Sequence, residues 1–327
     1  IETMGKAIRC ILDVVGLMRV THQPFKLCNL LGTSVKVEKG RASGWMVVVM
    51  YLSPWRRSAA LARSQKGKLI IRAVSKLTGI AEKTIQSRMR MWNSCAYADG
   101  CKGPCLAITS GHLKYPELHL FEFAKTVLLA TDRKRFVDRL NFEIEKSHRR
   151  AIRAGFKFAV RLNGGSDLNF IDIIESHPDV QFFDYTKDPT MMMRFLRGEL
   201  PRNYHLTFSR GSSNWSLCAR ILRMGGNVAL VLRNSQNSKI GKRIRIQHGT
   251  SILYPGYFYS HVISGDIDDN RFLDDVDFKT KRGKIVELTG KGQPIMNDAS
   301  GFAMDSYDDI KTQINEMIAS VGCGVSQ

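Results

Sequence analysis

Three cysteines stand close together in the segment NSCAYADGCKGPCLAITSGH, residues 93–112. Cys95, Cys101 and Cys105 have the spacing C-x5-C-x3-C, and the glycines and proline among them indicate a loop. Thiolates on a loop can converge on one metal, so this spacing favours a zinc site or an iron–sulfur cluster. A zinc site would need a fourth ligand, and the nearby candidates are His112 and His119. Three ordinary thiols without a metal are the alternative.

Two aspartates could supply acid–base or nucleophilic chemistry. Asp167 and Asp184 each follow an expected strand, with Arg161 and Lys187 nearby in the sequence. At one barrel mouth, two such carboxylates could act as nucleophile and general base. Alternatively, Asp167 caps the helix after it and Asp184 pairs with a cation.

Strands and helices must position these residues, and they alternate about four times between residues 115 and 233. This alternation predicts an α/β fold with a parallel sheet. We favour a partial or full (βα) barrel, because polar residues fall just after successive strands. The expected strands are 44–52, 157–164, 180–186, 203–209, 227–233, 261–275 and 283–292; one long helix is expected over 115–154, and an exposed polar excursion over 234–249. The residues at or just after these strands that could line a pocket are Arg161, Asn163, Asp184, Tyr185, Lys187, His205 and Ser209.

The charge of the chain is strongly basic and uneven. The net charge is +19, and residues 1–115 hold nineteen Lys or Arg against five Asp or Glu. Residues 56–90 are the densest part, with ten basic residues and one acid, Glu82. Such a surface attracts polyanions, of which nucleic acid is the commonest in a cell. A solubilising face is the alternative; membrane-surface binding is disfavoured because the run lacks a broad apolar face.

The basic run contains a segment that resembles a bacterial helix-turn-helix, IRAVSKLTGIAEKTIQSRMR, residues 71–90. Gly79 would make the tight turn, and Ile80 and Ile85 would face inward. A plain basic helical hairpin is the alternative. The nucleic-acid-binding candidates, with DNA as the expected partner, are Lys83, Thr84, Gln86, Ser87 and Arg88 on the exposed face, and Arg56 and Arg57 in the adjoining run.

Four segments follow from these patterns. They are an N-terminal part with the first strand (1–55), a basic helical insertion (56–92), a barrel-like catalytic and metal domain (93–303), and a C-terminal helix and tail (304–327). The chain has seven cysteines, an odd number, and they are unevenly spread along the sequence, which argues against a disulfide framework. The start of the chain is a poor signal peptide, and no apolar run approaches the roughly 20 residues of a membrane span. We therefore expect a cytoplasmic location and no membrane partner, with the oligomeric state open.

The chain also resembles a family of bacteriophage and prophage proteins. The resemblance is carried by GTSVKVEKG, NSCAYADGCKGPCL, AVRLNGGSD, VQFFDYTKDP, NYHLTFSR, GGNVALV and SGDIDDNRFLD, over roughly residues 28–60 and 93–303. Residues 61–92 depart from the family pattern. The resemblance implies a protein of an infected or prophage-bearing bacterial cell and no particular activity.

The order of motifs is similar to that of the radical S-adenosylmethionine (SAM) enzymes, which have a partial βα barrel, a three-cysteine loop and a glycine pair. That resemblance implies an iron–sulfur cluster on Cys95, Cys101 and Cys105, with SAM beside Gly164 and Gly165. The cysteine spacing departs from the usual C-x3-C-x2-C of those enzymes.

Three hypotheses about function remain. The first is a radical-SAM-like enzyme that modifies a nucleic-acid base or its precursor. The second is an enzyme similar to the guanine transglycosylases, with zinc on the three cysteines and a histidine, and with Asp167 and Asp184 as catalytic residues. The third is a DNA-binding or regulatory protein without catalysis, in which zinc is structural.

Overall fold

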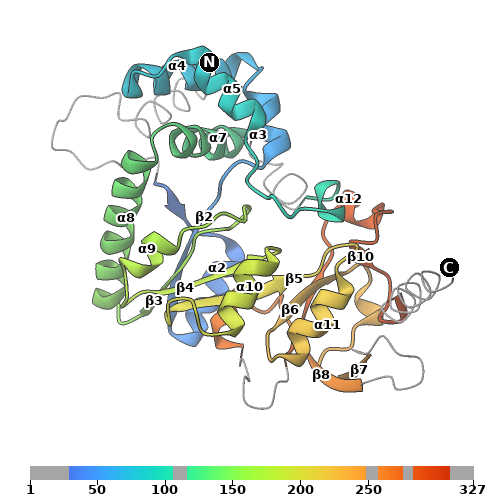
Figure 1. The fold of residues 1–327 in the computed structure, drawn as a ribbon. Helices are drawn as coiled ribbons and strands as arrows, with labels where there is room; N and C mark the ends of the chain where they lie inside the picture. The colour runs from blue at the N-terminus through green and yellow to red at the C-terminus, as the bar shows by residue number, and fades with distance from the viewer. Residues whose placement is uncertain (1–28, 106–115, 248–256, 275–282, 310–327) are drawn as a thin grey trace. The chain divides into compact units, whose positions relative to one another are not determined.

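A mixed α/β fold with a ten-stranded, mostly parallel sheet is present in the computed structural model, which describes residues 29–105, 116–247, 257–274 and 283–309 (Figure 1). The strand order is β1-β2-β3-β4-β5-β6-β9-β8-β7, and β10 also pairs with β6. The α/β class and the parallel sheet expected from the alternation are confirmed. The strands are β1 (Leu31–Gly32), β2 (Trp45–Met50), β3 (Lys157–Arg161), β4 (Gln181–Thr186), β5 (Tyr204–Ser209), β6 (Val228–Leu232), β7 (Arg243–Gln247), β8 (Tyr257–Ser264), β9 (Ile285–Thr289) and β10 (Ala303–Met304).

Helices follow most of the parallel strands, as βα units require. In the described part of the chain, none of them is both long enough and apolar enough to cross a bilayer. The α-helices are α2 (Val35–Lys39), α3 (Trp55–Leu61), α4 (Gln65–Thr78), α5 (Glu82–Met91), α7 (Pro116–Thr131), α8 (Arg133–Arg153), α9 (Ile171–Glu175), α10 (Pro189–Leu196), α11 (Trp215–Arg223) and α12 (Gln293–Met296). Short 3₁₀ turns cover Gly40–Ser43, Gly100–Lys102, Ser235–Asn237 and Arg271–Leu273.

The chain divides into two compact units. Unit 1 comprises residues 1–96 and 106–182, and unit 2 comprises residues 97–105 and 183–327. The boundary falls inside β4, and the segment 97–105 belongs to unit 2 although its sequence neighbours belong to unit 1.

Unit 1 contains a central parallel pair, β2 and β3, in which Val48 lies opposite Val160. The β2 residues from Met46 to Met50 are all buried, the pattern of a parallel strand covered on both faces. The helical stretch expected over residues 115–154 is present, but it is divided into α7 and α8. Asp132 interrupts the run: its carboxylate accepts a hydrogen bond from the backbone N–H of Arg135 and caps the start of α8.

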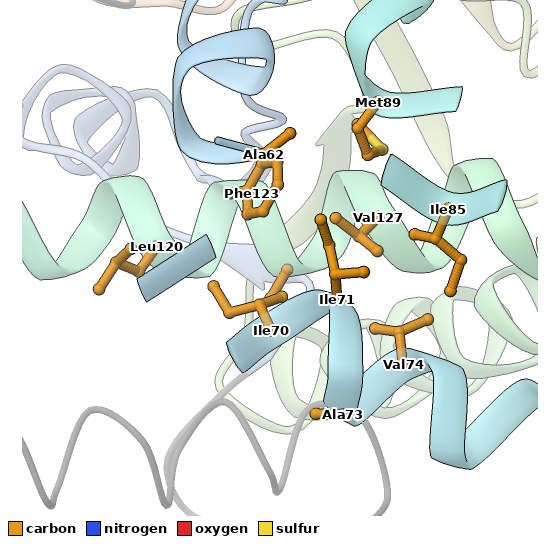
Figure 2. Close-up of a cluster of buried hydrophobic side chains, with 11 residues drawn as sticks. Ala62, Ile70, Ile71, Ala73, Val74, Ile85, Met89, Leu120, Phe123 and Val127 are labelled. Atoms are coloured by element: carbon orange, nitrogen blue, oxygen red, sulfur yellow. The ribbon is translucent and has the colours of Figure 1, made fainter. Parts of the chain in front are cut away.

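A helical module, defined here as residues 55–92 together with α7, forms its own core within unit 1 (Figure 2). In Figure 2, Val74 of α4 lies beside Ile85 of α5, whereas Ile70 and Ile71 of α4 lie against α7. Each of these side chains is at most 2% exposed, and burying one stabilises the fold by about 1.5–3 kcal/mol. The inner faces of the helices are therefore occupied by packing, which leaves the polar outer faces to solvent. The remaining buried members of this core are Ala62, Ala73, Met89, Leu120, Phe123, Ala124 and Val127.

Unit 2 contains the parallel strands β5, β6, β9 and β8. β5 pairs with the beginning of β6, where Phe208 lies opposite Val228. β10 pairs with the end of β6, where Ala303 lies opposite Val231. Thus β10 takes up the pairing of β6 beyond the end of β5.

Two expectations for unit 2 need correction. Residues 234–249 are not all an excursion, because Arg243–Gln247 forms β7, paired antiparallel with β8. Conversely, the strand expected over 261–275 ends at Ser264, and a turn follows it. The acid-rich sequence DIDDN breaks the strand, since Asp and Asn favour turns. The C-terminal helix expected after residue 304 falls mostly outside the described residues.

Candidate functional site

The turn between α4 and α5 has the form that the sequence predicts. Gly79 ends α4 with φ at 74°, a left-handed conformation that glycine adopts without steric cost. Its N–H donates to the carbonyl of Ser75. Ile85 is fully buried after the turn and Ile80 packs against the same core. Two helices joined by a glycine turn therefore present a common outer surface.

Most of the side chains expected to contact nucleic acid are exposed. Arg56, Lys83, Thr84, Ser87 and Arg88 are exposed, and the Arg88 guanidinium also donates to the carbonyl of Ala130.

Gln86 and Arg57 are used differently. The Gln86 amide is half-buried and donates to the carbonyl of Ala62 at 2.9 Å, which ties α5 to α3. Arg57 points inward and forms an ion pair with Glu122 at 2.7 Å, with both side chains less than 10% exposed. We therefore correct the expectation that these two residues face a nucleic acid.

The Arg57–Glu122 pair belongs to a buried polar network between α3, α7 and the sheet. Burial raises the pKa of Glu122 to about 7, although Arg57 and Lys125 act to lower it. Burial lowers the pKa of Lys125, whose ammonium donates to the carbonyl of Leu30 at 2.9 Å. Thr126 accepts from the backbone N–H of Ser53, just after β2. These bonds attach the helical module to the strands of unit 1.

The end of β3 carries the polar residues expected there, but most serve local structure. The Asn163 side chain accepts from Ser166 and Leu168 and donates to the carbonyl of Leu168, so it organises the turn after the strand. A Cβ on Gly164 would come within 3 Å of Val49 and of the Met50 carbonyl. Gly164 is thus required by close packing against β2.

Cys95 lies at the same strand end. Its thiol is 3.8 Å from the carbonyl oxygen of Gly165, so the start of the cysteine segment and the glycine pair are neighbours within unit 1. The backbone N–H of Asp167 donates to the carbonyl of Ser94 at 2.7 Å. Asp167 does not cap α9, because the capping position is Phe170. Arg161 is the last residue of β3 and is half-buried.

The other two cysteines belong to unit 2. Asp99 holds their segment through its carboxylate, which accepts from the backbone N–H of Ser212 at 2.9 Å and from that of Ser213 at 3.4 Å. Cys101 packs against an apolar cluster that includes Val231 and Phe302. Cys105 is half-buried.

A metal site on the three cysteines stays a prediction. His112 lies outside the described residues, and within the described part of the chain no group of three or more His, Cys, Asp or Glu side chains is placed to hold a metal ion. Cys95 belongs to unit 1 whereas Cys101 and Cys105 belong to unit 2. Because the described side chains form no complete donor set, we assign no chemical step to a metal.

Asp184 does not follow β4, as expected, but lies inside it. Its carboxylate is 2% exposed and accepts a hydrogen bond from the Tyr204 hydroxyl at 3.1 Å. Asp167 belongs to unit 1 and Asp184 to unit 2, so neither unit by itself assembles the pair. The strand expected over 180–186 already contained Asp184, and β4, which runs to Thr186, confirms that position within the strand.

Lys187 follows the last residue of β4, and Ser209 is the last residue of β5. The Lys187 ammonium is 3.4 Å from the carbonyl of Arg210 and lies over the Phe302 ring at 5.2 Å. The Ser209 carbonyl accepts from Asn214. Arg210 itself is buried, and its guanidinium donates to the carbonyls of Gly301 and Phe302. These contacts anchor the segment that leads into β10.

Two other polar features of unit 2 are internal. Arg271, 2% exposed, forms ion pairs with Asp268 and Asp274, so a buried guanidinium neutralises the acid-rich turn. His205 lies within β5 against the Phe195 ring, and burial lowers its pKa to about 4. The His205 imidazole is therefore neutral near pH 7.

Comparison with known proteins identifies the family. A family model described as Gene product 88 matches residues 56–305, which is most of the chain, so the chain belongs to that family of phage-type proteins. The match includes residues 61–92, which we expected to depart from the family. Nothing in it supports the radical SAM resemblance. No curated protein and no solved structure matches the chain.

Sequence reasoning missed Asp99, Glu122 and Arg210. Asp99 stands in the turn-forming run ADGC, which signals a capping carboxylate but not its distant partner. Glu122 stands among apolar residues, in LFEFA, and a charged residue in such a context indicates a buried, bonded side chain. Arg210 stands in the mixed sequence TFSRG, which carries no such signal.

Proposed function

We propose that this protein binds double-stranded DNA through the outer surface of its helical module. One observation carries the proposal: nine of the ten basic residues in 56–90 are exposed, and the single acid, Glu82, is paired with Arg72 at 3.3 Å. Such a surface offers many contacts to phosphates, which supply most of the non-specific affinity for DNA. The nine exposed residues are Arg56, Arg63, Lys66, Lys68, Arg72, Lys76, Lys83, Arg88 and Arg90.

The turn geometry supports a division of roles on α5. In helix-turn-helix proteins the N-terminal residues of the second helix contact base edges, and flanking cations hold the phosphates. We assign base edges to Thr84 and Ser87 of α5, whose side chains are exposed. Lys83 and Arg90 are exposed on the same helix and provide the charge. The core beneath α5 keeps the helix rigid while these side chains stay in solvent.

Fluorescence anisotropy with a labelled duplex of random sequence tests the proposal. We expect Lys83→Ala and Arg90→Ala each to weaken binding and to reduce the slope of log K against log salt concentration by about 0.9 for each phosphate that the variant no longer neutralises. Lys146→Ala, an exposed lysine on α8 in the same unit, is the charge-matched control and should leave binding unchanged. Equal losses of affinity in the control, or no loss in the two α5 variants, would rule out this surface.

A nucleic-acid-modifying enzyme with a metal on Cys95, Cys101 and Cys105 is the second candidate that we propose. The contact between the Cys95 thiol and the Gly165 carbonyl favours it, because it joins the cysteine segment to a parallel-strand end, where α/β barrels carry their chemistry. A barrel-like closure of the parallel strands belongs to this candidate.

Metal analysis and the absorption spectrum of protein purified without oxygen test the second candidate. Iron with sulfide and a brown colour, absent in Cys105→Ala, would support a cluster. About one zinc per chain would support a zinc site. Wild-type protein that holds no metal would contradict both the iron–sulfur cluster and the zinc site.

A further inference from the structure

The β7–β8 hairpin of unit 2 has one buried face and one polar, solvent-facing face. Residues opposite each other in register are Arg243 with His261 and Arg245 with Tyr259, and all four side chains are exposed. Because strand residues alternate between faces, these four lie on one side. Of the residues that alternate with them, Ile246, Ser260 and Val262 are buried and Ile244 is half-buried.

The charge of the segment that contains this hairpin is of one sign. Residues 234–265 contain four basic residues, Lys239, Lys242, Arg243 and Arg245, and no Asp or Glu. All four are exposed. The pairing of the hairpin extends to Lys242, whose carbonyl accepts from the backbone N–H of Val262, so the lysine is held on the ribbon. The concentration of cations is a local one, remote in sequence from the helical module.

Two aromatic rings lie among these cations. Tyr259 is 54% exposed, an uncommon position for a large ring on a sheet. The Arg243 Nε donates to the Nε2 of His261 at 2.8 Å; a guanidinium only donates, so that imidazole nitrogen is the acceptor. This bond across the strands fixes both side chains on the exposed face.

We propose that this face binds a single strand of nucleic acid, with Tyr259 stacking on an unpaired base and Arg243 and Arg245 contacting phosphates. Proteins that bind single strands combine a basic surface with aromatic rings, because every base offers a flat face for stacking. In a duplex the bases already stack on one another, so an exposed ring gains nothing there. The surface belongs to unit 2 and is independent of the helical module proposed for duplex DNA.

Binding of labelled oligothymidine to the full chain tests this inference. We expect Tyr259→Ala to weaken binding about tenfold, the loss of affinity that follows removal of one stacked base. Tyr259→Phe keeps the ring and should bind within about twofold of the wild type. Arg245→Ala should reduce the slope of log K against log salt concentration by about 0.7, the value for one phosphate of a single strand. Arg220→Ala, an exposed arginine on α11, is the charge-matched control.

The alternative is that the arginines only keep β7, an edge strand of the sheet, from pairing with strands of other chains. In that case Tyr259→Ala binds like the wild type, or Arg220→Ala weakens binding as much as Arg245→Ala, and the inference is overturned.

Photocrosslinking of the wild-type protein to an oligonucleotide that contains iodouracil gives a second measurement, which does not depend on the folding of a variant. A crosslink at Tyr259 of the wild-type protein that persists in the presence of excess unlabelled duplex supports the inference and separates it from the duplex proposal. Crosslinks confined to the helical module would contradict it.

Discussion

The carboxylate of Asp99 accepts a hydrogen bond from the backbone N–H of Ser212 at 2.9 Å, which ties the cysteine segment to the turn after β5. The approach is close: a Cβ on Gly211 would fall 2.1 Å from the same carboxylate, so only glycine fits beside it. Asp99 therefore positions Cys101 within unit 2.

Replacing Asp99 should loosen this segment. We expect Asp99→Ala to lower the free energy of unfolding by about 1–3 kcal/mol, because the part-buried backbone N–H of Ser212 and the exposed N–H of Ser213 lose a charged acceptor. We also expect faster alkylation of Cys101, followed by mass spectrometry of the labelled peptide. Asp99→Asn keeps one acceptor oxygen, so its stability and its rate of Cys101 alkylation should lie between those of the wild type and of Asp99→Ala. Asp179→Ala, at an exposed position, is the control. An unchanged rate of Cys101 alkylation in Asp99→Ala would contradict the view that Asp99 positions Cys101.

The turn of the helical module should depend on the backbone of Gly79. Gly79→Ala is expected to cost about 1–2 kcal/mol, because φ at 74° is unfavourable for a residue with a Cβ. No atom lies within 4 Å of that Cβ, so the cost comes from the backbone and not from a clash. Gly79→Asn should cost less, since asparagine tolerates this conformation. Urea unfolding measures both; equal losses of stability in the two variants would contradict this explanation.

Gly164 should be required for folding. Gly164→Ala places a Cβ about 2.6 Å from Val49 and 2.7 Å from the Met50 carbonyl, and backbone cannot yield as a flexible side chain can. We expect a lower melting temperature in the absence of any cofactor. Gly103→Ala is a matched control, because open space surrounds that position. A Gly164→Ala protein as stable as the wild type would show that β2 and β3 can separate at little cost.

Stability should depend on pH through Glu122. Its pKa in the folded chain, about 7, lies above the ordinary value of 4.5, so the folded state binds the proton more tightly than the unfolded state. The stability that this proton contributes is present below pH 4.5 and is lost as the pH rises through about 7. Over that range we expect the wild type to lose stability relative to Glu122→Gln, by on the order of 3 kcal/mol.

Thermal unfolding of both proteins at a series of pH values measures this difference. The glutamine keeps a side-chain oxygen that can accept from Arg57, so the comparison isolates the titration of the carboxyl. Parallel stability curves for the two proteins would contradict a raised pKa at Glu122.

Local patterns were enough to predict most strands of the sheet. β2 is a run of β-branched residues bounded by Gly44, and β6 is a similar run, VALVL, so both are visible without a partner strand. The α4–Gly79–α5 turn was likewise predictable, since glycine and the apolar spacing are local signals. Breaks between helices were harder to predict. The apolar residues of α7 and α8 follow one helical period, and only the cap by Asp132 separates the two helices.

The sequence by itself determined the α/β class, the basic outer surface and the turn at Gly79, because periodicity, charge and glycine act through near neighbours. Only the tertiary structure decided that Arg57 faces Glu122, that Asp184 is held inside β4 by Tyr204, and that Asp99 reaches Ser212. Each of those pairs joins residues at least 20 positions apart. Burial and pairing of a polar side chain depend on which distant segment packs against it, and no local pattern records that choice.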